Sequence, residues 1–173
     1  MIIGGDFKVK LFSLAKKLGG MPRDAEYAIV VYEDGHISPI ISQKMFSGAM
    51  IPFSVAGHGV AVAVLHTHPV PRTAPSLTDL NILFNMAIYN VPVYLGTIHR
   101  GEDEITLTLY IARRPINPEE ARKVLRESYI YELLNVREGF KKAVSDKQIY
   151  EQHKMLQKLN ISIERYRFKI KMS

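Results

Sequence analysis

The chain has 173 residues, 47% of them hydrophobic and 23% charged, with a formal net charge of +6. This length and composition predict one full-sized core of an ordinary soluble globular protein, with an appendage. The absence of cysteine excludes disulfide bridges, cysteine nucleophiles and zinc sites with thiolate ligands. No apolar stretch approaches the roughly 20 residues that span a bilayer, and the N-terminus lacks a signal-peptide pattern. We therefore expect a cytoplasmic protein with no membrane contact.

The first part of the chain reads as a helix followed by strands. Apolar residues recur at helical spacing from Phe7 to Leu18, after Asp6 as N-cap and before the Gly19-Gly20 pair. Four strands are then predicted, at Glu26 to Tyr32, Ile37 to Ser42, Ala49 to Phe53 and Val60 to His66. The first and last of these strands are apolar on both faces, which predicts a sheet covered on both sides.

A second helix and a hairpin follow. The helix is predicted from Leu77 to about Tyr89, and the hairpin pairs Val93 to Arg100 with Ile105 to Arg113. The four residues between these strands, Gly101 to Glu104, form the turn. Strands interleaved with helices predict an α/β (α+β) fold.

A new unit begins near residue 117. Asn117 as cap, Pro118 at the first helical position and Glu120 at the capping-box position are a strong helix start. The pattern stays helical to about residue 160, with a break near Gly139, and Tyr166 to Lys171 alternates as a strand. We therefore divide the chain into a main domain, residues 1–116, and a basic, mainly helical C-terminal extension, residues 117–173.

Two histidines and an aspartate are spaced as metal ligands. His66 and His68 end the apolar run GVAVAVLH, and residues i and i+2 of a strand point to the same side, so both imidazoles can meet one ion. After a proline-rich loop, Ser76-Leu77-Thr78-Asp79 opens the second helix and can bring the Asp79 carboxylate to the same ion. Two nitrogens, one oxygen and an open fourth position are typical of a catalytic zinc site.

Each part of this pattern also has a purely structural interpretation. A histidine pair at a strand end is more often a surface or hydrogen-bonded feature than a pair of ligands. Ser76 and Asp79 can form a helix capping box, which is compatible with metal binding by Asp79. The joint spacing, His-x-His, seven residues, then Ser-x-x-Asp, favours the metal site.

That spacing resembles the signature of the JAMM (MPN-plus, JAB1/MPN) metallopeptidases, which is an upstream Glu followed by this same run. The resemblance covers residues 6 to about 115. It implies a JAB/MPN-type mixed β-sheet flanked by helices. It also implies that His66, His68 and Asp79 hold Zn²⁺, with water as fourth ligand, and that Ser76 donates a hydrogen bond to the oxyanion.

Two glutamates are candidates for the upstream Glu. Glu26 and Glu33 lie at the two ends of the run YAIVVY, seven residues apart, so in a regular strand they face opposite sides. The family places its glutamate at the start of such a strand, after the first helix, which selects Glu26. Glu33 precedes the turn signal Asp34-Gly35, and we interpret it as a solvated turn residue.

The resemblance implies a prokaryotic-type, deubiquitinase-like zinc isopeptidase. Glu26 would be general base and then general acid, and Ser76 would stabilise the oxyanion. Family members remove ubiquitin-like modifiers or trim small sulfur-carrier proteins that end in Gly-Gly, so conjugates of such proteins are the expected partners. An extended tail of this kind can lie against an exposed edge strand, which we place within Ile40 to Gly59.

The net charge of the chain lies in its last part. Residues 140–173 contain 9 basic and 3 acidic residues, whereas residues 1–139 contain 14 of each. Charge runs are mostly solvated surfaces. A functional interpretation is electrostatic guidance of nucleic acid or of an acidic protein partner. The interleaved aromatics Tyr150, Tyr166 and Phe168 favour that role modestly, and they are equally suited to packing on the core or on a second subunit of a homodimer.

Two other functions are compatible with the sequence. One is a nucleic-acid-associated protein with a related His-x-His-Pro motif, which would use the basic extension. The other is a non-catalytic MPN scaffold subunit, which the complete ligand set disfavours. The remaining histidines lack ligand spacing, so we expect surface or supporting positions for them: His36, His58, His99 and His153.

Overall fold

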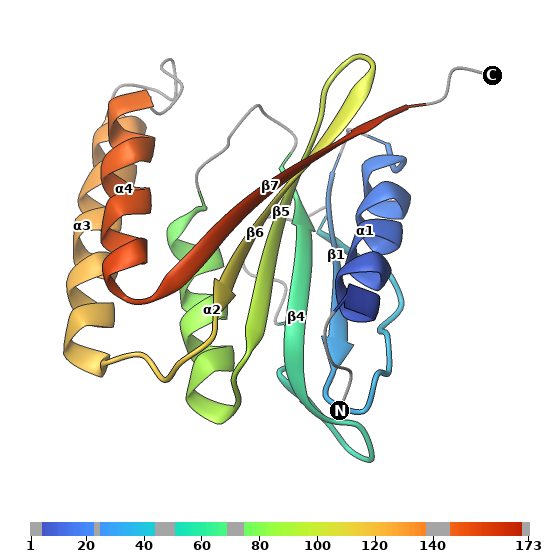
Figure 1. Ribbon diagram of the computed structural model, residues 1–173. Helices are drawn as coiled ribbons and strands as arrows, with labels where there is room; N and C mark the ends of the chain where they lie inside the picture. Colours follow the sequence, from blue (N-terminus) through green and yellow to red (C-terminus); the bar gives the residue numbers. More distant parts are fainter. Residues whose placement is uncertain (1–4, 23–24, 44–50, 69–74, 138–145, 171–173) are drawn as a thin grey trace.

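The computed structural model describes residues 5–22, 25–43, 51–68, 75–137 and 146–170. Within these residues a seven-stranded, mostly antiparallel sheet is flanked by four helices (Figure 1), so the predicted α/β class is confirmed. The helices are Gly5–Gly19 (α1), Leu77–Tyr89 (α2), Pro118–Arg137 (α3) and Asp146–Lys158 (α4). The strands are Glu26–Tyr32 (β1), Ile41–Gln43 (β2), Ser54–Val55 (β3), Gly59–Thr67 (β4), Val93–Arg100 (β5), Glu104–Ala112 (β6) and Ile161–Lys169 (β7).

The strand order places the end of β4 in the middle of the sheet. The order is β2-β1-β4-β5-β6-β7, with the short β3 paired to β4. Strands β4 and β5 are parallel, so the chain must cross over between them, and α2 makes this crossover. The start of α2 therefore lies close to the carboxyl end of β4. Ligands commonly bind at the carboxyl ends of strands in α/β proteins.

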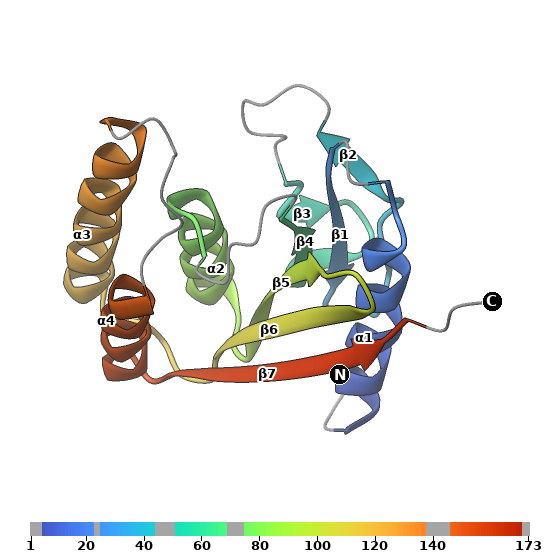
Figure 2. The same cartoon turned by 90° about the horizontal axis from the view of Figure 1, so that it is seen from above.

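Helices cover both faces of the sheet. Seen from above, α1 lies on one side and α2, α3 and α4 lie on the other, with β2 and β7 at the two ends of the sheet (Figure 2). The α1 side buries one row of strand residues against Phe7, Leu11 and Leu18. The opposite side buries the alternate row against α2, α3 and α4. This two-sided burial explains why β1 and β4 are apolar on both faces.

Two predicted strands are displaced in the structure. Ile37, at the start of the predicted strand, forms an isolated bridge with Val31, but the continuous strand β2 begins at Ile41. Between them the Ser38 hydroxyl accepts the Val30 N–H at 3.0 Å, and Pro39 has no N–H to donate. The strand predicted at 49–53 is wrong in position: residues 51–53 are not in a strand, and a two-residue strand forms at Ser54–Val55. Residues 49 and 50 lie outside the described residues.

The extension contributes a strand to the sheet. Its helical part forms two helices, and the predicted break at Gly139 lies outside the described residues. Strand β7 begins at Ile161, five residues before the predicted Tyr166, because Asn160 adopts a left-handed backbone (φ 61°) that ends the helical segment. Strand β7 then pairs with β6 over its whole length. Within the described residues, no helix is long and apolar enough to span a membrane.

Candidate metal centre

Strand β4 delivers the two histidines to one place. The imidazole of His66 points to the face covered by α2, as expected from its cross-strand partner Ala28 in that core. Thr67 points to the other side, where its hydroxyl accepts the Tyr27 N–H at 2.9 Å and holds β1 against β4. His68 follows the strand, and its N–H donates to the Ile98 carbonyl of β5 at 2.9 Å. The backbone that carries both imidazoles is thus held by the neighbouring strands β1 and β5.

Helix α2 delivers the carboxylate. Ser76 is the N-cap, and its hydroxyl accepts the Asp79 N–H at 3.1 Å while the Asp79 carboxylate accepts the Ser76 N–H at 2.9 Å. This capping box fixes the Asp79 side chain at the start of the helix. Asp79 is only 1% exposed, a burial that carboxylates rarely show unless they are paired.

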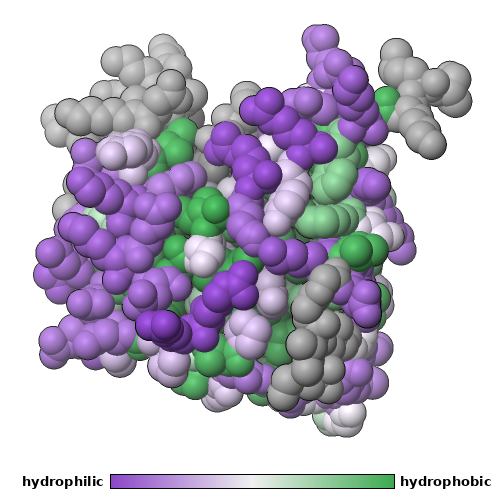
Figure 3. All heavy atoms as spheres, viewed as in Figure 1, coloured by the Kyte–Doolittle hydropathy of each residue, from purple (hydrophilic) through white to green (hydrophobic). Residues whose placement is uncertain are grey.

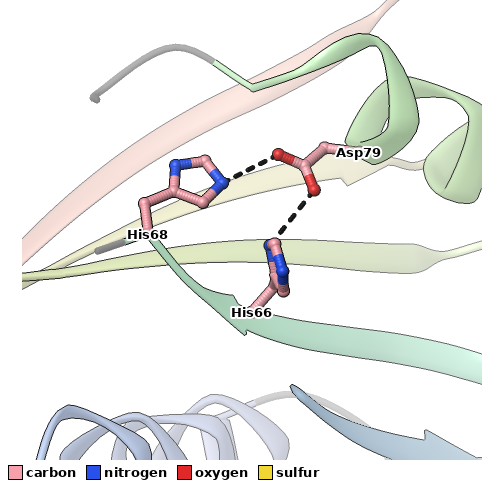
Figure 4. A group of neighbouring side chains, drawn as sticks. All are labelled: His66, His68 and Asp79. Carbon is pink, nitrogen blue, oxygen red and sulfur yellow. Dashed lines mark hydrogen bonds and ion pairs between the residues drawn. The ribbon is translucent and has the colours of Figure 1, made fainter. Parts of the chain in front are cut away.

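The three side chains converge on one point (Figure 4). The Asp79 carboxylate lies with Oδ2 2.9 Å from His68 Nε2 and with Oδ1 3.3 Å from His66 Nδ1. One ligand atom from each residue lies within 4.8 Å of the others, and His66, His68 and Asp79 are the group of this kind in the part of the chain that the structure describes. Ligands at about 2.0–2.2 Å from a tetrahedral zinc are roughly 3.3 Å apart, so small side-chain shifts would suffice.

One contact of the cluster falls short of a well-formed hydrogen bond. His66 Nδ1 and Asp79 Oδ1 are buried and form an ion pair at 3.3 Å, but among the described residues neither atom makes a hydrogen bond of good geometry. Buried polar atoms are nearly always satisfied, and an ion bound between such a pair is one explanation. The donor set therefore fits a divalent cation.

The electrostatics of the cluster favour a cation. Burial lowers the pKa of His66, but the close contacts of its imidazole with the carboxylates of Asp79 and then Glu26 outweigh burial and raise that pKa to about 9. Burial raises the pKa of Asp79, and the contacts with His66 and His68 outweigh it and lower that pKa well below its usual range. A site that stabilises an imidazolium between two carboxylates also suits a metal ion once the imidazole is neutral.

The two candidate glutamates lie at opposite ends of β1. Glu26 is largely buried and places Oε2 2.9 Å from His66 Nε2. Glu33 lies at the other end of the strand, where its Oε1 accepts the Val60 N–H at 3.1 Å. The structure thus brings Glu26, and not Glu33, to the histidine cluster.

Sequence reasoning missed the support that the extension gives to this centre. Gln152 on α4 is buried, and its side-chain amide donates to the Pro75 carbonyl and to the Ser128 hydroxyl, both at 3.3 Å. Pro75 immediately precedes the cap Ser76, so α4 holds the start of α2. A glutamine in an amphipathic, charged helix looks like a surface residue, and the sequence carries no signal that it is buried.

The other histidines occupy supporting or surface positions. His153 on α4 bonds the buried Tyr110 hydroxyl, with 3.0 Å between Nε2 and the oxygen. His36 and His58 lie beside Asp34 near the turn after β1. They lie away from His66, His68 and Asp79, the candidate ligands that we call the metal cluster. His99 is half-buried on β5. None of these four belongs to a ligand group in the described residues.

Comparison of the chain with models of known protein families, with curated proteins and with solved structures gave no match. The assignment of a function therefore depends on the geometry of the cluster and on the motif spacing.

Proposed function

We propose that this chain is a zinc-dependent peptidase with the JAB/MPN fold, of the JAMM (MPN-plus) type. Its substrates would be ubiquitin-like or small sulfur-carrier proteins, cleaved after their C-terminal Gly-Gly. The observation that supports this most is the convergence of His66, His68 and Asp79 with Glu26 at the same cluster. These residues occur along the chain in the order and spacing of that family's signature.

Zinc is the ion that this donor set suits best. Two imidazole nitrogens and one carboxylate oxygen are a common ligand set of catalytic zinc, which keeps one position for water or substrate. With no cysteine in the chain, thiolate-rich structural zinc sites are excluded. When bound, zinc would lower the pKa of a water molecule to about 7 and polarise the scissile carbonyl.

Glu26 is the residue positioned to move the proton. Its Oε2 lies 2.9 Å from Nε2 of His66, whose Nδ1 faces Asp79, so Glu26 is the glutamate beside the cluster, and we assign to it the transfer of a proton from water to the leaving amine. The Glu26 side chain is 13% exposed, which leaves it a route to solvent. The carboxylate of Asp79, by contrast, is held by the capping box and by both histidines, so it is suited to binding rather than to proton transfer.

Ser76 is positioned to stabilise negative charge. Its hydroxyl oxygen accepts the Asp79 N–H, which leaves the O–H proton to be donated elsewhere. Because the capping box fixes this hydroxyl beside a metal ligand, it is preorganised for a developing oxyanion. The cap and the oxyanion donor are therefore compatible roles of one side chain.

Strand β2 supports the proposed way of binding a tail. It is one edge of the sheet, it lies within the predicted range Ile40 to Gly59, and its Gln43 pairs with Glu26 of β1. An extended tail added outside β2 would lie two strand spacings, about 10 Å, from Glu26 on β1, so the end of the tail has to turn towards the proposed base.

The test is cleavage of a defined substrate. Zinc-loaded protein is incubated with fusions in which a ubiquitin-like or sulfur-carrier protein is joined through Gly-Gly to a reporter, and the products are identified by intact mass. Cleavage after Gly-Gly is expected, and Glu26→Gln should lower turnover by about 10²- to 10⁴-fold with zinc still bound. Glu33→Gln is the matched control and should keep wild-type turnover.

Two results would contradict the proposal. Full turnover of Glu26→Gln would remove the assigned base. Purified protein that takes up no stoichiometric zinc would instead support a metal-free scaffold of the same fold.

A further inference from the structure

The two faces of the edge strand β7 differ in charge. The face on the side of α2 and the metal cluster carries three exposed basic residues at alternate positions, Arg165, Arg167 and Lys169. The residues between them face α1, where Glu164 pairs with Lys8. Figure 3 shows a hydrophilic band that follows β7 across the front of the molecule. Nearly all of the charge that this strand shows to solvent is therefore positive.

The aromatic residues of β7 are turned inward. Tyr166 and Phe168 pack on Phe12 of α1, with ring centroids 4.6 Å and 5.4 Å apart. Proteins that bind single-stranded nucleic acid present aromatic faces on which bases stack. Because these rings are occupied by α1, the basic face of β7 lacks that feature, and its charges favour an acidic protein segment over nucleic acid.

The outer edge of β7 is available for strand pairing. In the described part of the chain β7 pairs with β6 alone and ends the strand order. Figure 2 shows it as the outermost strand of the sheet. An edge strand presents alternate N–H and C=O groups that an extended peptide can bind. Arg167 makes one weak surface contact, 4.0 Å from Glu104, and its side chain remains 66% exposed.

This strand is in register with the metal cluster. Cross-strand partners form one row across the sheet, from His66 through Thr97 and Thr108 to Arg165. Neighbouring strands are about 4.8 Å apart, so a segment added outside β7 would lie about 19 Å from His66. Roughly six extended residues span that distance. A partner bound at β7 can therefore reach the cluster with another part of its chain.

We propose that the outer edge of β7 binds an acidic, extended segment of the protein that is cleaved. Its acidic side chains would pair with Arg165, Arg167 and Lys169, and its main chain would extend the sheet. The identification of this segment as part of the substrate rests on the proposed peptidase function. The binding itself does not, and it is measured on metal-free protein.

The experiment uses a fluorescent ten-residue peptide of alternating Glu and Val and the full-length protein without zinc. Fluorescence anisotropy compares it with a Gln-Val peptide of the same pattern and with a Glu-Val peptide N-methylated at alternate residues. Binding of the Glu-Val peptide is expected to weaken as salt rises. The Gln-Val peptide should bind less tightly because it lacks charge, and the N-methylated peptide because it lacks main-chain donors.

Charge reversal on the protein locates the site. Arg165→Glu/Arg167→Glu should weaken binding of the Glu-Val peptide by roughly tenfold or more. The matched control is Arg122→Glu/Lys123→Glu on α3, where both residues are exposed and the change in net charge is the same. This control should lose much less affinity, because only long-range attraction changes.

Three results would overturn the proposal. Equal losses in the two charge-reversed proteins would show that net charge alone attracts the peptide. Equal binding of the N-methylated peptide would exclude strand addition. Tighter binding of a 12-nucleotide single-stranded DNA, lost on reversal at β7 but not at α3, would make nucleic acid the ligand of this strand. A peptidase that fails to cleave would change none of these measurements.

Discussion

The described residues include two clusters of two histidines and an aspartate, which differ in ring geometry and in burial. In the metal cluster, His66 and His68 meet edge to face, with ring planes 82° apart, over a buried Asp79. In the second cluster, His36 and His58 stack with ring centroids 3.7 Å apart and planes 9° apart, beside the exposed Asp34. The residue types are the same, and the difference lies in ring geometry and burial.

Ring geometry decides which cluster can hold an ion. The lone pairs of imidazole lie in the ring plane, so parallel rings 3.7 Å apart cannot both aim a nitrogen at one ion. The oxygens of Asp34 are also taken, by the His36 N–H at 2.8 Å and by His58 Nδ1 at 2.6 Å. In the metal cluster one histidine lies in β4 and the other directly follows it, and Asp79 Oδ1 is held only by the ion pair with His66 Nδ1 at 3.3 Å. Composition alone therefore does not identify a metal site.

The largest difference between the clusters should appear in metal affinity. Asp79→Asn removes a ligand, and we expect zinc affinity to fall by more than about 100-fold, since even partners behind a ligand contribute 10- to 100-fold. Asp34→Asn is the matched change in the second cluster and should leave affinity unchanged. Competition with a chromogenic chelator measures both.

Circular dichroism of the metal-free variants separates loss of a ligand from loss of fold. Zinc affinity that falls equally in both variants would mean that the two clusters are not distinct, and the contrast drawn from ring geometry would then be wrong.

Stability against pH should also distinguish the buried cluster. The pKa of His66 is raised from 6.5 to about 9 in the folded, metal-free protein, so its contribution to stability is complete below pH 6.5 and is lost as pH rises towards 9. Urea unfolding of chelator-treated protein should therefore show a free energy of unfolding that falls by on the order of 2 kcal/mol between pH 6.5 and 9.5, after allowance for partial solvent access.

His66→Gln is the control for this pH dependence. The variant cannot gain the proton, so the same measurement should give a flatter profile. A wild-type profile as flat as that of the variant would show that His66 is not protonated in the folded state.

The metal cluster could be predicted from sequence because most of its geometry is local. His66 near the end of β4 and His68 just after it share a side, and Ser76 and Asp79 form a capping box at the start of α2. One long-range step remained, the crossover that returns α2 to the end of β4. Helices α1 and α2 and the β5–β6 hairpin were predicted within two residues for the same reason, since their patterns are periodic and their ends carry caps or turns.

The features that the sequence did not reveal depend on distant contacts. The sequence predicts no element for residues 161 to 165, but they form the first part of β7 because β6 has a free edge and the core accommodates Ile161 and Ile163. The short β3 depends on pairing with β4, as its two residues have little strand pattern of their own. The buried Gln152 depends on the docking of α4 beside Pro75.

The buried Gln152 on α4, which holds the start of α2, should have a smaller effect on the metal cluster than its ligands have. Gln152→Leu would leave the Pro75 carbonyl and the Ser128 hydroxyl without this donor, and we expect about 1–2 kcal/mol lower stability from chemical denaturation. Zinc affinity should fall about 10-fold, because the start of α2 carries the Asp79 ligand.

The control is Gln157→Leu, because Gln157 is an exposed glutamine on the same helix. This variant should change neither the stability nor the zinc affinity. A stability loss in Gln152→Leu with unchanged zinc affinity would show that the extension supports the fold without affecting the metal cluster.

The smallest effect is expected in the second cluster itself. His58 and Asp34 are 36% and 41% exposed, and pairs that are open to solvent contribute little to stability. The backbone N–H of His36, and after it the His58 imidazole, lowers the pKa of Asp34, so part of its stabilisation remains when His58 is removed. We expect His58→Ala to shift Tm by less than about 2 °C by differential scanning calorimetry.

The zinc stoichiometry of His58→Ala should equal that of the unmodified protein, whereas His68→Ala should lose zinc. Zinc lost from His58→Ala would make the stacked histidines ligands as well, and ring geometry would no longer distinguish the two clusters.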